Sequence, residues 1–300
     1  MTVERGTAPR VAAAVITYNR APTLTRTLRS LGAQTAQLDE IIVVDNASSD
    51  ETPAMVARNF PSVRLVRLAE NTGAAGGFAV GIRDAVASGH DWVWVFNDDD
   101  VPQPDALTLM LSAVKELPAR TGVIACARRS AHGELHPLGA RWERRHVPIA
   151  RADPADPPVP VDVVTLSGTL VSAEAVREVG LPKSDYFMMI EDLDYCLRIR
   201  RAGWGIYVLP RPLTTSLNLG SDGSSPPWRG YYQTRNQLAM TLERRSLPEL
   251  FWWLVRTAKF CAGALRSGDR PVERIRLRAL GTWHAVRGVS GRTIPPTSTS

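Results

Sequence analysis

One stretch of the sequence, residues 92–100, constrains the fold more than any other. It reads Trp-Val-Trp-Val-Phe-Asn and ends in three consecutive carboxylates, Asp98, Asp99 and Asp100. Five apolar residues rich in Trp and Val predict a strand that is buried on both faces, as in the middle of a parallel sheet. Like charges without a counter-ion are costly to bury, so the acids belong at the accessible carboxyl end of this strand. In open α/β sheets, ligands bind at that edge.

The acid triplet by itself has two interpretations. Asp98 and Asp100 could share a divalent cation that bridges the phosphates of a nucleotide, because Mg and Mn prefer carboxylate oxygens as ligands. Alternatively, the triplet is a solvated turn before a helix that starts near Pro104, since Asp is favoured at helix N-caps.

Alternating strands and helices around this stretch indicate the fold class. Apolar runs at 11–17, 41–44 and 63–68 predict strands, and residues at helical spacing follow each run. This alternation predicts an α/β fold in which a parallel sheet carries helices on both faces. Beyond residue 104 we expect strands at 122–127, 161–171 (broken at Ser167-Gly168) and 205–209, helices at 173–179 and 191–202, and a loop or hairpin within 128–160.

The carboxyl-terminal part of the chain differs from the rest in charge. From Arg229 onward it holds 13 Lys and Arg against 4 Asp and Glu, although the whole chain has a net charge of only +6. Apolar residues at helical spacing between Leu247 and Leu265, and a basic stretch at 274–287, predict amphipathic helices. Such segments either lie on an anionic membrane surface or pack on the protein with their Arg heads in water. No nucleic-acid motif accompanies the charge, so we expect no nucleic acid partner.

Several sequence features favour a cytoplasmic protein. Residues 1–10 lack the apolar core of a secretory signal, and no stretch approaches eighteen uncharged apolar residues. Three scattered cysteines suggest neither a disulfide framework nor a zinc site. We therefore expect a cytoplasmic location, either free or peripheral on the inner face of the cell membrane. The sequence leaves open whether the protein forms a homo-oligomer.

Two further segments are candidates for ligand contact. Asp45 ends the second predicted strand, where it could accept a hydrogen bond from a nucleobase or a ribose, or support the turn into the next helix. The segment Asn71–Gly77 contains three glycines, which let a backbone approach a ligand closely. It matches neither common phosphate-binding pattern, so a tight turn is the alternative.

A second acidic cluster, Glu191-Asp192-Leu193-Asp194, opens a predicted helix. Acids in a first turn are stabilised by the helix dipole, which is the plain explanation. The chemical explanation is a general base, because transfer of a group to a hydroxyl requires a carboxylate that takes the proton. We expect Asp192 to be this base, with Glu191 contacting the acceptor and Asp194 in a cap or salt bridge.

Taken together, these motifs resemble family 2 glycosyltransferases of the GT-A fold over about residues 10–215. Within this family the chain looks most similar to actinobacterial galactofuranosyl- and rhamnosyltransferases. This closer similarity rests on the Gly-Gly-Phe sequence, the Trp-rich strand and residues 231–236. The blocks that carry the resemblance occur in the family's order: Ala14–Arg20, Val43–Asp50, Asn71–Gly73 with Gly76–Phe78, Asp98–Asp100, and Glu191–Tyr195 with Leu197–Arg198.

The resemblance implies a Rossmann-like, mostly parallel sheet and an inverting glycosyl transfer. The donor would be a nucleotide-diphosphate sugar of the UDP-galactofuranose or dTDP-rhamnose type, and the acceptor a hydroxyl of a saccharide, a lipid-linked saccharide or a natural product. Residues 1–228 would form the catalytic domain, with a nucleotide half at about 10–103 and an acceptor half at about 104–228, and residues 229–300 a basic helical extension. The residues implied to line the nucleotide are Thr17, Tyr18, Arg20, Asp45, Asn71, Gly76, Gly77, Asp98 and Asp99.

The same resemblance implies Mn or Mg as cofactor, held by Asp98 and Asp100, and Asp192 as the base. Many relatives add a His ligand after the strand that follows the Asp192 helix, whereas Ser216 stands at about that position here. A hydroxyl is a weaker ligand for Mn but acceptable to Mg, and Asn218 or water could complete the shell.

Two alternatives stay open at this point. The first is a non-catalytic nucleotide-sugar or lipid-binding protein of the same fold. The second is a sugar nucleotidyltransferase, which would need a Gly-rich loop with Arg or Lys near the amino terminus. Residues 17–21 do not supply such a loop.

Overall fold

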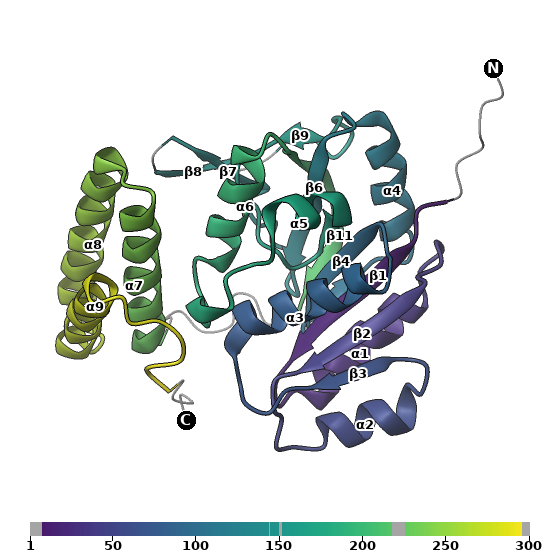
Figure 1. The fold of residues 1–300 in the computed structure, drawn as a ribbon, viewed down its shortest axis with the longest axis horizontal. Coiled ribbons are helices and arrows are strands. Elements are labelled where there is room, and N and C mark those ends of the chain that lie inside the picture. The colour runs from purple at the N-terminus through teal and green to yellow at the C-terminus, as the bar shows by residue number, and fades with distance from the viewer. Residues whose placement is uncertain (1–7, 144, 150–151, 218–225, 296–300) are drawn as a thin grey trace.

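A computed structural model describes residues 8–143, 145–149, 152–217 and 226–295 of the chain. Within these residues a mixed sheet has the strand order β3-β2-β1-β4-β10-β6-β11-β5, with the short β9 paired to β11. Helices cover both faces of the sheet, and three C-terminal helices stand together at one side of it (Figure 1). The predicted α/β fold with a C-terminal helical part is therefore confirmed.

The first half of the chain builds the parallel part of the sheet, as the sequence predicts. Thr17 at the end of β1 pairs with Asp45 at the end of β2, and Ile16 pairs with Asn97 at the end of β4. The carboxyl ends of these strands therefore meet at one edge. The elements are β1 (Val11–Thr17), α1 (Ala21–Gly32), β2 (Glu40–Asp45), α2 (Thr52–Asn59), β3 (Arg64–Arg67), α3 (Gly73–Ala87) and β4 (Trp92–Asn97).

Side-chain alternation along β1 explains why this strand lies inside the sheet. Val11, Ala13 and Val15 pack with apolar residues of α1 and α2, whereas Ala12 and Ala14 pack with those of α3. Successive side chains of a strand point to opposite faces, so every residue of an apolar run is buried only when helices cover both faces.

The second half of the chain completes the sheet with antiparallel pairings. β10 runs antiparallel between β4 and β6, and β5 runs antiparallel to β11. The elements are β5 (Asp100–Pro102), α4 (Ala106–Glu116), β6 (Thr121–Ser130), the hairpin of β7 (Gly139–Trp142) and β8 (His146–Ile149), β9 (Val159–Pro160), β10 (Thr169–Ser172), α5 (Ala173–Val179), the 3-10 turn η1 (Ser184–Tyr186), α6 (Glu191–Arg201) and β11 (Gly205–Ser216).

Two strand predictions in this half have the wrong extent. The strand predicted at 161–171 begins only at Thr169, because Gly168 turns the chain with a φ of +77° and residues 161–166 contribute an isolated bridge at Val163. The strand predicted at 205–209 continues to Ser216, with register shifts around Pro212 that keep it paired to β6. This extension brings Ser216 opposite Asp100.

The C-terminal helices are α7 (Pro227–Glu243), α8 (Leu247–Ser267) and α9 (Pro271–Val286). α7 is firmly attached to the α/β part, since Arg235 is only 1% exposed and donates to the carbonyl oxygen of Tyr186 at 3.1 Å. In the described part of the chain, every helix is too short or too polar to cross a bilayer.

Gly73 at the start of α3 offers a direct test of the packing. It has a φ of +73°, and a Cβ there would overlap the carbonyl group of Phe187. Gly133 also has a positive φ, +87°, but open space around it. A left-handed non-glycine residue costs about 1–2 kcal/mol. We expect Gly133→Ala to lower the free energy of unfolding by that amount, and Gly73→Ala to lower it by at least about 1 kcal/mol more in urea denaturation. Equal losses would contradict the close contact between α3 and Phe187.

Candidate active site

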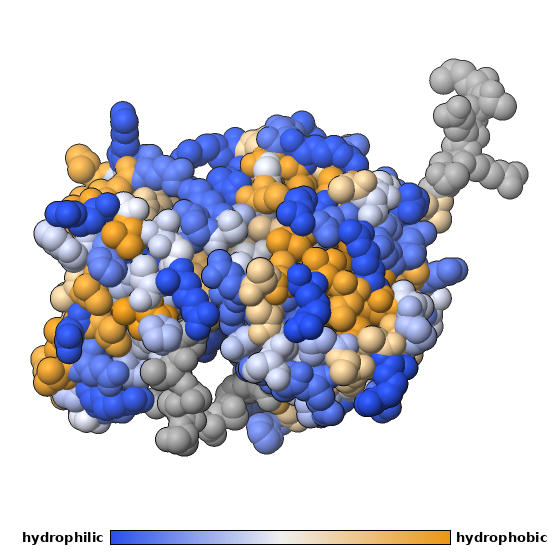
Figure 2. Space-filling view, turned by 60° about the horizontal axis from the view of Figure 1, so that its bottom comes forward, coloured by the Kyte–Doolittle hydropathy of each residue, from blue (hydrophilic) through white to orange (hydrophobic). Residues whose placement is uncertain are grey.

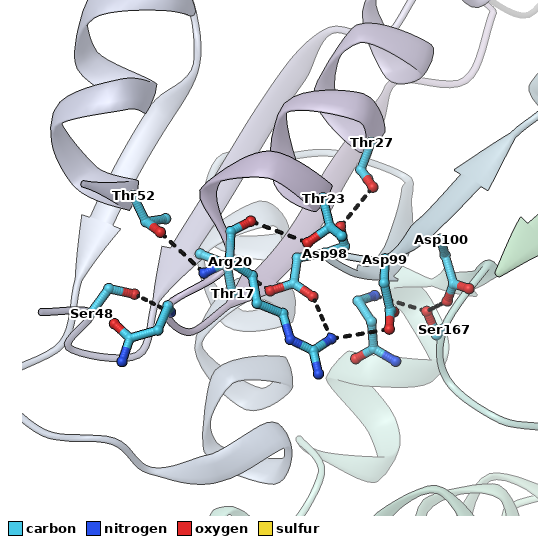
Figure 3. Close-up of polar contacts among 12 residues, drawn as sticks. Thr17, Arg20, Thr23, Thr27, Ser48, Thr52, Asp98, Asp99, Asp100 and Ser167 are labelled. Atoms are coloured by element: carbon cyan, nitrogen blue, oxygen red, sulfur yellow. Dashed lines mark hydrogen bonds and ion pairs between the residues drawn. The ribbon is translucent and has the colours of Figure 1, made fainter. Parts of the chain in front are cut away.

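The strand ends bring one group of expected nucleotide-binding residues together. Thr17 Oγ1 donates to Asp98 Oδ2 at 2.8 Å, and Arg20 Nη1 lies 3.3 Å from Asp98 Oδ1 and 3.0 Å from Asp99 Oδ2. Thr27 of α1 donates to the backbone carbonyl of Asp98 at 2.8 Å, which fixes the strand end against the helix. Figure 3 shows the Arg20 guanidinium reaching across to both carboxylates. The predicted cluster of Thr17, Arg20, Asp98 and Asp99 therefore exists.

Asp98 is a carboxyl group in an unfavourable environment. Burial raises its pKa from the ordinary 3.8 to about 6, and Asp99 acts in the same direction. Arg20 and the hydrogen bond from Thr17 lower the pKa but do not compensate fully. Asp98 therefore carries an electrostatic cost near neutral pH, which is common at binding sites.

Asp45 lies at the same edge and already has protein partners. Its side chain is fully buried, with Oδ1 accepting the Ser48 amide at 3.0 Å and Oδ2 lying 3.1 Å from Arg67 Nε. Both interactions shape the turn after β2. The neighbouring Tyr18 is 43% exposed, so its ring is open to a ligand at this edge. Nucleobase recognition by Asp45 stays a prediction.

The glycines of the third block pack a helix against the sheet. A Cβ on Gly76 would overlap the Thr72 side chain, and a Cβ on Gly77 would lie 2.5 Å from Ile16 Cγ2. The missing side chain of Gly77 therefore lets α3 approach β1 closely, whereas that of Gly76 makes room for Thr72 at the start of the same helix. Asn71 accepts the amide hydrogen of the first residue of α3 at 2.8 Å. Ligand contact by these three residues stays a prediction.

Asp100 belongs to a separate cluster. Arg128 Nη2 lies 2.6 Å from its Oδ1, and Ser167 Oγ donates to its Oδ2. Ser216, its register neighbour on β11, has a buried Oγ with no hydrogen-bond partner. A buried hydroxyl without a partner is costly, so this oxygen fits a position that a ligand completes.

These residues fit a hard cation, although incompletely. A carboxylate offers about four lone pairs, so Asp100 can accept from Arg128 and Ser167 and still bind a metal together with Ser216. The Asp98 carboxylate points toward Arg20 and not toward Asp100 (Figure 3). Across the described residues, no three His, Cys, Asp or Glu side chains cluster as ligands. Mg often takes its other ligands from phosphates and water. Asn218 lies outside the described residues.

The backbone before α6 has an unusual conformation. Phe187, Met189 and Ile190 have φ values of +63°, +65° and +76°, in the left-handed region that non-glycine residues avoid. Asn236 of α7 donates to the carbonyl oxygens of Met188 and Met189 at 2.8 and 2.9 Å, which holds this segment in place. Strained residues held in this way are typical of functional sites.

This segment leads directly into the second acid pair. Burial raises the pKa of Glu191, with the Asp192 carboxylate as the second cause, and burial also raises the pKa of Asp192. Glu191 Oε2 is buried without a hydrogen-bond partner, whereas Asp192 Oδ1 accepts the Leu193 amide at 2.7 Å. Asp194 instead pairs with Arg198 at 2.9 Å, as expected of a salt-bridge residue.

One cavity lies beside Asp192 and beside the partners of Asp100. It measures about 790 Å³, and its lining includes Asp192 as well as Arg128 and Ser167, the two side chains that hold Asp100. Asp100 itself is fully buried and borders the cavity only through these two partners, about ninety residues before Asp192 in the sequence. A cavity of this size suits a small organic ligand or part of a larger one.

The family follows from a comparison with known proteins. Residues 13–176 match the model of the glycosyl transferase family 2, which covers more than half of the chain. The chain belongs to this family. The resemblance noted in the sequence is thereby confirmed, and nothing supports the nucleotidyltransferase alternative.

The curated relatives of this glycosyl transferase family 2 protein include two enzymes of mycobacteria. The galactofuranosyltransferase GlfT1 of Mycobacterium tuberculosis is 31% identical over 199 residues, 64% of this chain and 65% of the relative, so just under two thirds of that relative is covered. The N-acetylglucosaminyl-diphospho-decaprenol L-rhamnosyltransferase of the same species is 30% identical over 64% of this chain and 71% of the relative. The similarity to actinobacterial enzymes is thereby confirmed.

Solved structures agree on the fold. Residues 1–349 of S. aureus TarS, in complex with UDP, align with a TM-score of 0.55 at 15% identity, over 93% of this chain and 92% of that one. At this identity the likeness establishes the fold alone. It is consistent with the GT-A arrangement that the sequence predicts.

Sequence reasoning on this family 2 chain missed three positioning residues. Arg128 and Ser167 hold Asp100, and Asn236 holds the segment before Asp192. The only signals were the strand break at Ser167 and the place of Asn236 in the block 231–236. Neither signal indicates a contact partner, because each partner is distant in the sequence. Arg128 lies 28 residues and Ser167 lies 67 residues from Asp100, and Asn236 lies 48 residues from Met188.

The raised pKa of Asp98 predicts a stabilising substitution. The folded state favours the protonated acid, so this group contributes most to stability at low pH, and that contribution is lost as the pH rises from 3.8 through about 6. A shift of about two units corresponds to about 3 kcal/mol at most. Asp98→Asn should therefore raise Tm by a few degrees at pH 7.5 and leave it unchanged at pH 4, by calorimetry.

The exposed Asp105 supplies a matched control for this test. Asp105→Asn should shift Tm at neither pH, because a solvated carboxyl group loses little on folding. If Asp98→Asn destabilises the protein at pH 7.5, the ion pair with Arg20 outweighs the cost of burial, and the account of this site is wrong.

Proposed function

We propose that this protein is an inverting glycosyltransferase that moves a sugar from a nucleoside-diphosphate donor to a hydroxyl of a saccharide or lipid-linked acceptor. The observation that carries the proposal is the single cavity that contains Asp192 together with the two side chains that hold Asp100. Family membership supports the reaction class.

On the donor side, the strand-end residues bind the nucleotide. Thr17, Tyr18 and Arg20 line it, Asp45 contacts the base, and Asp98 with Asp99 contacts the ribose. Arg20 and Arg128 bring positive charge to the region of the diphosphate, which makes that region attractive to phosphate oxygens. Asp100 and Ser216 would hold Mg or Mn, with Asp98 as the further predicted ligand. When bound, such a cation stabilises the negative charge on the leaving diphosphate.

On the acceptor side, Asp192 acts as general base. It accepts the proton of the acceptor hydroxyl while the hydroxyl oxygen bonds to the anomeric carbon and the bond from that carbon to the diphosphate breaks. Attack from the face opposite the leaving group inverts the anomeric configuration. Glu191 stays protonated to a higher pH than an ordinary Glu, because burial and Asp192 raise its pKa, so it can donate a hydrogen bond to the acceptor.

Replacing the proposed base tests this role directly. Asp192→Ala should lower kcat by about 10²–10⁴-fold without weakening donor binding by more than a few-fold, since a general base contributes mainly in the transition state. The exposed Glu174 gives the matched control, and Glu174→Gln should leave the rate unchanged. Wild-type rates in Asp192→Ala would remove Asp192 as base. Donor binding by the wild type without turnover, over a panel of acceptors, would favour the non-catalytic alternative.

The names of the curated relatives, which specify galactofuranosyl and rhamnosyl transfer, support the proposed donor class. We expect UDP-galactofuranose or dTDP-rhamnose to raise Tm selectively in a thermal-shift screen with Mn, because a ligand that binds only the folded state stabilises it. Asp100→Asn should abolish the Mn-dependent part of the rise. Equal shifts with all nucleotide sugars would contradict sugar selectivity, and equal shifts with and without Mn would contradict a metal at Asp100.

The C-terminal helices support a proposal of membrane contact. Leu247, Phe251 and Leu254 follow one face of α8 at helical spacing and are 78%, 58% and 54% exposed. Figure 2 shows apolar and hydrophilic residues mixed on the surface of the C-terminal helices at its left side. An exposed apolar stripe on a basic helix suits the interface of an anionic membrane. The acceptor would then be reached at that surface.

Vesicle sedimentation tests this contact. The full chain should bind phosphatidylglycerol-containing vesicles more strongly than neutral ones, and the triple change Leu247→Ser, Phe251→Ser and Leu254→Ser should weaken binding at least tenfold. Leu135→Ser, at a 43% exposed position outside these helices, should have no effect. Undiminished binding by the triple variant would contradict the role of this stripe.

A further inference from the structure

The cavity has a second wall opposite the α/β part, formed by α8 and the β7–β8 hairpin. Its lining includes Arg145 from the hairpin turn and Arg256 and Lys259 from α8. These α8 residues lie on a different face of the helix from Leu247, Phe251 and Leu254, because a helix turns by about 100° per residue. The membrane-facing stripe and this wall are thus separate features.

Charge on this side of the cavity is not balanced. Asp192 is the one acidic side chain among the described residues of the lining. The positive charge of Arg128 is paired with Asp100, whereas Arg145, Arg256 and Lys259 have no carboxylate within ion-pair distance in the described part of the protein. Three cations around one hollow without counter-ions predict a negatively charged occupant.

The environment of Arg256 disfavours its charge. Burial and the nearby Arg278 both lower the pKa of Arg256. Burial and Arg256 likewise lower the pKa of His146, which also lines the cavity. Desolvated positive charges that repel one another are stabilised when an anion binds between them.

Aromatic rings fix the directions of the guanidinium groups. The Arg145 guanidinium carbon lies 4.8 Å from the centre of the Trp252 ring, and that of Arg256 lies 5.4 Å from the centre of the Phe260 ring. Such stacking restricts long side chains and leaves their N–H groups free to bind an anion. Trp252 and Phe260 also line the cavity and give it apolar surface beside the cations.

We infer that Arg145, Arg256 and Lys259 form an anion subsite that binds a phosphate or diphosphate group of the acceptor, while the acceptor hydroxyl lies at Asp192. The identification of the ligand as the acceptor rests on the proposed function, whereas anion binding at the subsite does not require turnover. A phosphate-type group is favoured over a carboxylate because three cations line the same cavity and a phosphate or diphosphate offers more oxygens for them to bind. The apolar rings accommodate the group to which the phosphate is attached.

The test is a binding experiment that needs no catalysis. Isothermal titration of the full chain with farnesyl diphosphate, farnesol and inorganic pyrophosphate separates the anion from its apolar chain. We expect farnesyl diphosphate to bind at least tenfold more tightly than farnesol. The triple change Arg145→Gln, Arg256→Gln and Lys259→Gln should weaken farnesyl diphosphate at least tenfold. The matched triple Arg266→Gln, Arg276→Gln and Arg287→Gln removes the same charge from exposed positions outside the lining and should bind like the wild type.

Each outcome bears on the inference. Equal binding by the two triple variants, or equal binding of farnesol and farnesyl diphosphate, overturns the subsite. Loss of farnesyl diphosphate binding when UDP is present at saturation also overturns it, because the three cations would then serve the donor. Pyrophosphate that binds as tightly as farnesyl diphosphate supports the subsite and assigns a water-soluble phosphate-bearing acceptor, whereas much weaker pyrophosphate binding supports it with a lipid-linked one. If UDP fails to bind at all, the proposed function fails and the subsite stands.

Discussion

The backbone at residues 187–190 is the constraint on which the arrangement of the site depends. The Phe187 carbonyl accepts the amide of Ala75 in α3 at 3.0 Å, and Asn236 of α7 holds the carbonyls that follow. Left-handed non-glycine residues cost about 1–2 kcal/mol each, so the segment keeps its shape only because both helices bond to it. It joins the helix next to the donor edge to the helix that carries Asp192. A displacement of either helix would therefore move the base relative to the donor.

Several charged groups of the site lie in environments that disfavour their charge. Burial raises the pKa of Asp98 to about 6 and raises that of Asp192 and Glu191, while it lowers the pKa of Arg256 on the opposite wall. Among the described residues, Arg20 compensates Asp98 in part and Arg128 pairs with Asp100, whereas Asp192 and Arg256 have no ion-pair partner. Bound substrates with complementary charge relieve this cost, which is how many enzymes exchange stability for activity.

The sequence predicted the parts of the fold that depend on local pattern. The strands at 11–17 and 92–97 follow from apolar runs, the start of α6 at Glu191 follows from the acids of its first turn, and the structure agrees with all three. The extent of β10 and β11 could not be predicted from the sequence. It depends on the turn at Gly168 and on pairing with β5 and β6, which are contacts between distant segments. Likewise the acids were identified from sequence, but their partners Arg128, Ser167 and Asn236 were not, because nothing in a linear pattern specifies which distant side chain a carboxylate meets.

The central claim is that the donor diphosphate and the acceptor hydroxyl meet at the cavity lined by Asp192, Arg128 and Ser167, with the diphosphate next to Asp100. A crystal structure of the protein with UDP-galactofuranose or dTDP-rhamnose and Mn tests it most directly. The account predicts the diphosphate beside Asp100 and Ser216, and the anomeric carbon facing Asp192 with room for one hydroxyl oxygen between them. A donor bound with its diphosphate away from Asp100, or with its anomeric carbon turned away from Asp192, would contradict the account.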